Sequence, residues 1–278
     1  MTISLRSNVS SLVAQRHVGQ TQSSLNRSLA RLSSGFRINS ATDDAAGLGV
    51  SEVLKSQIRT LAQASRNASD GLSVVQTAEG AMGEVSSALL RMRELSVQAA
   101  SDNITDKERG YINTEFSDLK AEVDRIAKST KFNGSALIDG TFKTNGLDFQ
   151  VGHENGTDFR ITVTISDVTT TGLGLVAADA VDTKANAQAV MAKLDTSLDS
   201  LNTARAGLGA KANRLQTASS AVDVMRENLA AANSRIRDTN VASETSAFAR
   251  SQVLMQAGVS MLAQANAQPQ LALSLLGG

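Results

Sequence analysis

Few side chains in this sequence combine into a catalytic or metal-binding pattern. The 278 residues contain no cysteine and only two histidines, His17 and His153, which lie in unlike contexts. His153 begins the run HENGT, where Thr157 replaces the second histidine of an HExxH zinc motif. No GxxxxGK[ST] phosphate loop occurs, and the pair Gly47 and Gly49 lacks the third glycine of a nucleotide fingerprint. We therefore expect no metal, no cofactor and no enzymatic activity.

Two adjacent carboxylates, Asp43 and Asp44, are the nearest approach to a general acid–base pair. Neighbouring side chains at the start of a helix point in different directions, so this pair suits helix initiation better than catalysis. We predict Thr42 or Asp43 as the N-cap of a helix, with Asp44 adding negative charge to its first turn.

Apolar residues at regular spacing predict the elements that carry these groups. Within 194–236 they recur at sevens, at Leu194, Leu201, Leu208, Leu215, Val222, Leu229 and Ile236. A second series at sevens is Leu54, Leu61, Ala68, Val75, Met82 and Leu89, and a shorter one is Ile112, Phe116, Leu119, Val123 and Ile126. Such repeats are typical of helices that pack with coiled-coil character. We predict a bundle of three helices at 43–100, 106–128 and 183–237, the second opened by a capping box at Thr105 and Glu108.

Both chain ends carry apolar stripes of their own. One stripe comprises Val18, Leu25 and Leu32, and the other comprises Val241, Phe248, Met255 and Leu262. The second stripe is out of phase with the 194–236 series, so the helix must break between Arg237 and Asn240. We expect two terminal helices in a separate layer, whose apolar surface is covered only when copies pack side by side.

The apolar period changes to two in the middle of the chain. LDFQV (147–151) and DFRITVTI (158–165) alternate apolar and polar residues, which predicts strands. Asn-Gly pairs at 133–134, 145–146 and 155–156 favour hairpin turns. The predicted fold class is mainly α, with a long helical coiled-coil-like bundle from both chain ends and a small β-hairpin region at about 129–180.

The predicted organisation has two domains. Residues 1–42 and 238–278 would form a terminal helical inner domain for polymerisation, and 43–182 with 183–237 would form the bundle domain. The 27 basic and 27 acidic residues give no net charge, so we expect no nucleic-acid binding, and copies can associate without long-range repulsion. The sequence has no apolar run of about 18 residues, so we expect no membrane insertion.

Several segments resemble the bacterial flagellins. They are LNRSLARLSSGFRINSATDDAAGLGVSE (25–52), LLRMRELSVQAA (89–100), AEVDRIAKSTKFNG (121–134) and SQVLMQAGVSMLAQANAQPQLALSLL (251–276). The short middle of the chain is similar to family members without outer domains. The resemblance implies a structural subunit that self-assembles through both terminal helices into the extracellular flagellar filament for motility. It also implies export of the unfolded chain by the flagellar type III apparatus, without a cleaved signal peptide.

The resemblance further implies partners and contact residues. These partners are other copies of the chain, an export chaperone at about 241–276, and hook-associated junction and cap proteins. A contact with the host Toll-like receptor for flagellin is implied at Arg91, Leu95 and Glu115. The expected assembly interface comprises Leu25, Leu29, Leu32, Phe36, Ile38, Phe248, Met255, Val259 and Leu262, with Phe36 and Ile38 as buried anchors.

Three other interpretations stay open on the sequence alone. A hook–filament junction protein shares the terminal helices, although the RMRELSVQ match favours flagellin. Some flagellins carry an inserted metalloprotease domain, against which the short middle and the missing HExxH motif argue. A monomeric receptor ligand is compatible with a filament subunit.

Overall fold

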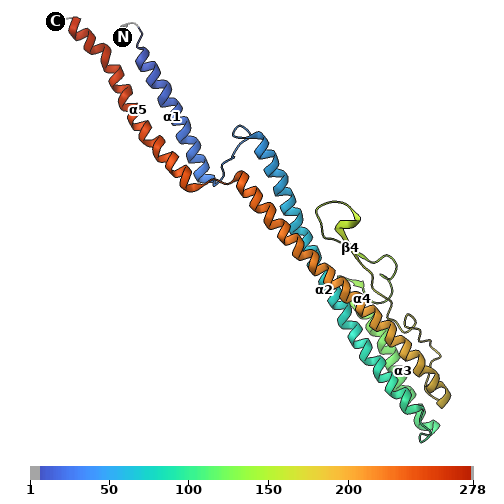
Figure 1. Cartoon of the computed structure of the whole chain (residues 1–278). Helices are drawn as coiled ribbons and strands as arrows, with labels where there is room; N and C mark the ends of the chain where they lie inside the picture. Colours follow the sequence, from blue (N-terminus) through green and yellow to red (C-terminus); the bar gives the residue numbers. More distant parts are fainter. Residues whose placement is uncertain (1–6, 277–278) are drawn as a thin grey trace. The chain divides into compact units, whose positions relative to one another are not determined.

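The computed structural model describes the main chain of residues 7–276 and the side chains of residues 7–268. Its helices are α1 (Val9–Ser34), α2 (Ala45–Ala99), α3 (Asp106–Ser129), α4 (Lys184–Arg237) and α5 (Val241–Leu276) (Figure 1). The chain forms two compact units, one of Met1–Ser56 with Asn228–Gly278 and the other of Gln57–Glu227. The prediction of a mainly helical protein is confirmed.

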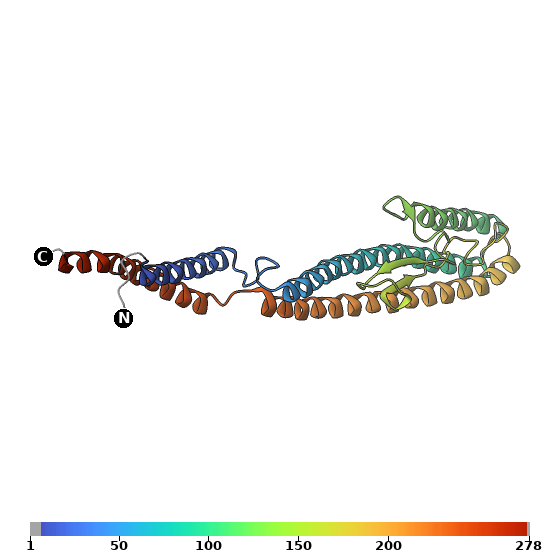
Figure 2. The same ribbon diagram turned by 90° about the horizontal axis from the view of Figure 1, so that it is seen from above.

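In the unit of residues 57–227, α2 and α4 run side by side (Figure 2). Buried residues of α2, α3, α4 and the β region form one core in this unit. Leu201 and Leu215 of α4, Leu89 of α2, and Phe116 and Val123 of α3 are all fully buried. These residues belong to the three predicted apolar series, which face one another as expected for packed helices. The predicted three-helix bundle is therefore confirmed within this unit.

The starts of α2 and α3 are capped by different side chains. Thr105 and Glu108 form the predicted capping box at the start of α3. At α2, the Asp44 carboxylate accepts a 2.8 Å hydrogen bond from the Gly47 amide. The Asp43 carboxylate instead accepts from the amide of Ser40 at 3.1 Å. The prediction of Thr42 or Asp43 as the N-cap is therefore wrong, because Asp43 is engaged in the preceding turn.

The middle of the chain contains two antiparallel strand pairs. Strands β1 (Lys131–Phe132) and β2 (Ser135–Ala136) flank Asn133 and Gly134, whose left-handed φ angles of 47° and 85° fit a two-residue turn. Strands β3 (Leu147–Gln150) and β4 (Arg160–Val163) pair with Leu147 opposite Val163. The short helix η1 (Thr157–Phe159) leads into β4. The predicted β region is confirmed, although only the first Asn-Gly pair forms a two-residue hairpin turn.

Candidate functional site

Helices α1 and α5 pack as an antiparallel pair (Figure 1). At one end the Asn8 amide Nδ2 donates to the Ala265 carbonyl at 2.8 Å. At the other end Arg31 and Glu244 form an ion pair of 3.7 Å, with both side chains partly buried. These contacts fix the register over nearly the whole of α1.

The seam between α1 and α5 combines small residues with partly buried aliphatic ones. Ser11 and Ser28 of α1 are each 6% exposed, and Leu25 and Leu32 on the same face are partly buried. The Ser11 hydroxyl donates to Asn266 Oδ1 at 2.6 Å. A Cβ added to Gly258 would lie 3.0 Å from Val18 Cγ2, so Val18 packs closely against this glycine. The seam therefore includes part of the predicted apolar stripe.

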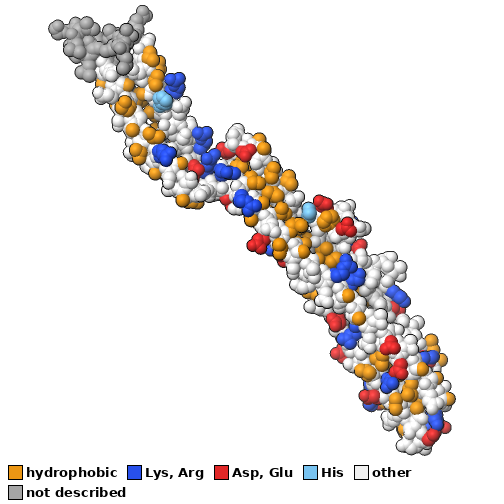
Figure 3. Space-filling model, in the orientation of Figure 1, with side chains coloured by type: hydrophobic (Ala, Val, Ile, Leu, Met, Phe, Trp, Pro, Cys, Tyr) orange, Lys and Arg blue, Asp and Glu red, His pale blue; other side chains and the backbone are white. Residues whose placement is uncertain are grey.

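Other large apolar side chains of this pair face outward. Figure 3 shows hydrophobic side chains in orange on the visible face of the molecule. They are Val9, Leu12, Val13 and Leu29 of α1, and Val241, Val253, Leu254, Val259 and Met261 of α5. Their exposed fractions run from 36% at Val13 to 66% at Met261. Part of this set lines a groove between the two helices. Such an exposed apolar surface is typical of an interaction site.

The predicted assembly residues fall into three classes of burial. Leu29, Val259 and Phe36 are exposed. Leu25, Leu32, Phe248, Met255 and Leu262 are partly buried, and Ile38 is fully buried. Sequence reasoning missed several of the exposed residues, including Leu254 and Met261. Their spacing of seven, one residue before Met255 and Leu262, is the signal that could have found them.

The two expected anchors of the link between α1 and α2 differ in burial. Ile38 is 2% exposed, and a Cβ added to Gly47 would lie 2.8 Å from its Cδ1. Phe36 is 39% exposed, because the guanidinium of Arg237 covers only one face of its ring. Ile38 is thus buried within the subunit, whereas burial of Phe36 against a neighbouring subunit stays a prediction.

The residues expected at a receptor contact are brought together only in part. Arg91 Nε donates to Glu115 at 2.9 Å, and Arg91 also bonds Glu94 at 3.0 Å. The hydrogen bond to Glu94, followed by that to Glu115, raises the pKa of Arg91 above its ordinary value. The side chains of Arg91 and Glu115 are 50% and 48% exposed, whereas Leu95 is 1% exposed. Leu95 therefore offers no surface to a partner in this conformation.

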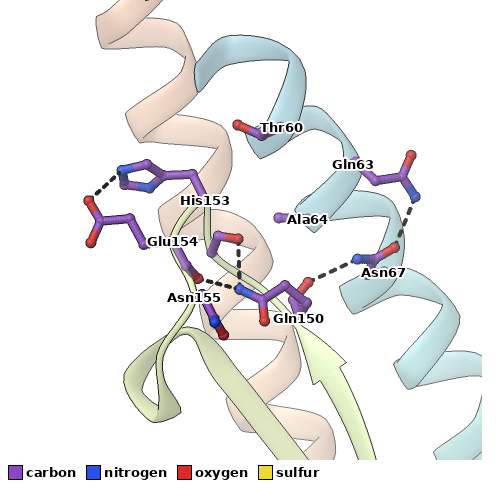
Figure 4. A pocket seen from close by; sticks show the side chains of 9 residues that line it. Thr60, Gln63, Ala64, Asn67, Gln150, His153, Glu154 and Asn155 are labelled. Atoms are coloured by element: carbon purple, nitrogen blue, oxygen red, sulfur yellow. Dashed lines mark hydrogen bonds and ion pairs between the residues drawn. The ribbon is translucent and has the colours of Figure 1, made fainter. Parts of the chain in front are cut away.

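The loop after β3 lies beside α2 and carries one of the two histidines (Figure 4). His153 Nε2 lies 3.4 Å from Glu154, with its ring edge-on to Phe159. Asn67 of α2 donates to the Gln150 carbonyl at 3.0 Å, which ties the loop to the helix. No group of three or more potential metal ligands occurs in the part of the chain that the structure describes. Among those same residues, no helix is long and apolar enough to cross a membrane.

Two family models match most of the chain. Residues 5–143 match the bacterial flagellin N-terminal helical region, and residues 191–276 match the bacterial flagellin C-terminal helical region. The chain belongs to the bacterial flagellin family. This flagellin is the structural, non-enzymatic subunit of the extracellular flagellar filament, and it self-assembles. The identification made from the four sequence segments is confirmed.

Relatives of this flagellin match it over almost their whole length. A flagellin of Halalkalibacterium halodurans is 43% identical over 269 residues, covering 97% of this chain and 98% of the relative. Flagellin FlaB2 of Treponema pallidum is 41% identical over 282 residues, and the flagellin of Bacillus subtilis is 39% identical over 302 residues, with the same two coverages. These lengths confirm the short form of the family.

A solved structure shares the fold of this flagellin. A flagellar hook-associated protein from Vibrio parahaemolyticus gives a TM-score of 0.55, covering 70% of this chain and 100% of that chain. Because the two sequences are only 15% identical, this likeness shows the fold alone and does not favour the hook–filament junction alternative. The crystal structure of Bacillus cereus flagellin is 32% identical, covers 60% of this chain and 94% of that one, and gives a TM-score of 0.49.

Proposed function

We propose that this flagellin polymerises through the apolar side chains that the α1–α5 pair leaves exposed. The observation that carries the proposal is the reversal of burial at two neighbouring residues of α1. Ser28 is 6% exposed and lies in the seam, whereas Leu29 is 55% exposed and faces outward. Covering a large aliphatic side chain stabilises an interface by about 1.5–3 kcal/mol. Repeated head-to-tail contacts of this kind build a helical filament when the rotation between copies does not close.

In this proposal the two parts of the chain have different tasks. Residues 1–42 and 238–278 act as the polymerisation domain, and residues 43–237 act as the bundle domain. The support for this division is the break in helix at residues 35–44 and 238–240, together with the apolar residues that α1 and α5 expose.

Polymerisation of purified variants tests the interface. Leu29→Ser and Val259→Ser each remove an exposed apolar side chain, so we expect the critical concentration for filament formation to rise roughly tenfold while helix content stays unchanged. Sedimentation and electron microscopy of seeded samples provide the measurement. Val176→Ser is the matched control, since Val176 is 50% exposed in the loop before α4. Normal assembly of both interface variants would show that the proposal is wrong.

The exposed face of α5 also suits the partners expected before and during assembly. We propose that an export chaperone holds residues of about 241–276 while the unfolded chain awaits the type III apparatus. Val253, Leu254 and Met261 support this, because each is more than half exposed on α5. Hook-associated junction and cap proteins would cover the same kind of surface at the filament ends. A triple Ser variant of these residues should lose co-purification with the flagellar chaperone, and full retention would count against this role.

A second proposed contact involves the host Toll-like receptor for flagellin. It is supported by the ion pair between Arg91 and Glu115, whose side chains are half exposed and 2.9 Å apart. Arg91→Ala is expected to weaken binding to the receptor ectodomain about tenfold or more. Arg93→Ala is the matched control, because Arg93 is paired with Asp195 on α4 instead. Leu95 would act only from within the core, by supporting the helix that carries Arg91. Unchanged binding of Arg91→Ala would refute the assignment.

A further inference from the structure

Two links of the chain are hydrogen-bonded to each other where the terminal helix pair ends. The link of residues 35–44 joins α1 to α2, and the link of residues 238–240 joins α4 to α5. The Arg37 amide donates to the Arg237 carbonyl at 2.6 Å, and the Thr239 amide donates to the Gly35 carbonyl at 2.9 Å. These two bonds fix the backbones of the links. Backbone bonds alone do not select the rotamer of Phe36.

The Arg237 side chain provides the missing restraint on that ring. Its Cζ lies 4.7 Å from the centroid of Phe36, within cation–π range. On its other side Arg237 NH1 pairs with Glu52 of α2 at 2.7 Å. The guanidinium is thus held between a carboxylate and an aromatic face, and its side chain is only 17% exposed. The contacts to the Phe36 ring and to Glu52 together orient the planar guanidinium of Arg237.

We infer that Arg237 is a positioning residue, which covers one face of the Phe36 ring and presents the rest of it to a second copy of this chain. The inference rests on the proposed assembly through the terminal helices. Phe36 is 39% exposed, and the two helices that it adjoins also expose Leu29, near the end of α1, and Val241, at the start of α5. The ring therefore continues the proposed apolar interface, which makes a second copy the occupant that best fits it.

A double-mutant cycle tests whether Arg237 acts through the ring. Phe36→Leu keeps an apolar side chain but removes the aromatic face, and Arg237→Gln removes the cation. We expect each single variant to raise the critical concentration for polymerisation roughly fivefold, and the double variant to be no worse than either single one. A purely structural role of Arg237 would instead give additive effects. Phe36→Tyr, which keeps the ring, should assemble at nearly the wild-type concentration.

The controls separate failure of the inference from failure of the proposed function. Arg235→Gln removes a nearby exposed arginine of α4 and should leave assembly unchanged. Helix content and the thermal midpoint of each monomer are measured to confirm that the variants fold. Suppose that Leu29→Ser blocks assembly while Arg237→Gln assembles normally, or that the effects of Phe36→Leu and Arg237→Gln are additive. In either case the inference is wrong and the proposed interface stands. If neither Leu29→Ser nor Val259→Ser affects assembly, the proposed interface itself is wrong.

Discussion

At the scale of single residues, the core position Leu201 and the surface position Val224 differ sharply on the same helix. Leu201 is fully buried, whereas Val224 is 59% exposed. Leu201→Ala leaves a cavity and is expected to lower the free energy of unfolding by about 2–5 kcal/mol. Val224→Ala should change it by less than about 0.5 kcal/mol. Urea unfolding followed by circular dichroism measures both, and equal effects would contradict the burial seen in α4.

Two glycines in the first turns of α2 should respond in opposite ways to alanine. Gly49 has open space around it, so Gly49→Ala is expected to stabilise the protein by about 0.5–1 kcal/mol. A Cβ on Gly47 would lie 2.5 Å from the Asp44 carboxylate and 2.8 Å from Ile38 Cδ1. Gly47→Ala should therefore displace the cap and the anchor and lower the thermal midpoint. Two stabilising substitutions would show that Ile38 and Asp44 are not held as described.

The capping box of α3 makes stability depend on pH. The backbone amide of Thr105, followed by its hydroxyl, lowers the pKa of Glu108 below its ordinary value of 4.5. A lowered pKa in the folded state adds stability above the unfolded-state pKa, and this is lost as the pH falls through the folded-state pKa. Wild type should exceed Glu108→Gln in stability at neutral pH, and this difference should shrink as the pH falls below the unfolded-state pKa and through the folded-state pKa. Thermal unfolding over a series of acidic pH values is the measurement, and a difference independent of pH would refute it.

At the scale of elements, the small serines in the seam of the α1–α5 pair set how closely the two helices approach. Ser28→Leu forces a large side chain into this seam and is expected to cost about 1–3 kcal/mol. Ser23→Leu adds the same side chain at an exposed position of α1 and should be tolerated. Thermal unfolding distinguishes the two variants. Equal stability of both would show that α1 and α5 do not pack through Ser28.

Periodicity predicted the helices because apolar residues that recur every seven positions fall on one face of a helix and are buried together. The break in helix at residues 238–240 was also predictable, since the phase of the apolar stripes changes there. The capping residue of α2 was not, because Asp43 and Asp44 have the same chemistry and only the turn at Ser40 distinguishes them.

The orientation of the candidate site depends on contacts between distant residues. Phe36 was expected to anchor the link, but its contact with Arg237, about 200 residues away in the chain, could not be predicted from the sequence. Likewise, Val18, Leu25 and Leu32 of α1 lie on the same helix face as Ser11 and Ser28 and are partly buried. The periodicity therefore predicted the face that meets α5, but not that serines would be its most buried residues.

At the scale of the whole molecule, removal of the N-terminal segment separates folding from assembly. Deletion of residues 1–40 removes α1 and leaves the core of α2, α3 and α4 intact. We expect the shortened chain to keep cooperative unfolding of residues 43–237 and to form no filaments. Circular dichroism and electron microscopy test the two parts. Filaments from the shortened chain would contradict the role of α1.

The pairing of α1 with α5 joins the first helix of the chain to the last one. Asn8 and Ala265, which are hydrogen-bonded at one end of the pair, are 257 positions apart in sequence. The core of α2, α3 and α4 needs no residue beyond 227. A chain truncated within α5 can therefore fold this core yet lacks the partner of α1. Such a chain cannot form the helix pair through which the subunit is proposed to polymerise.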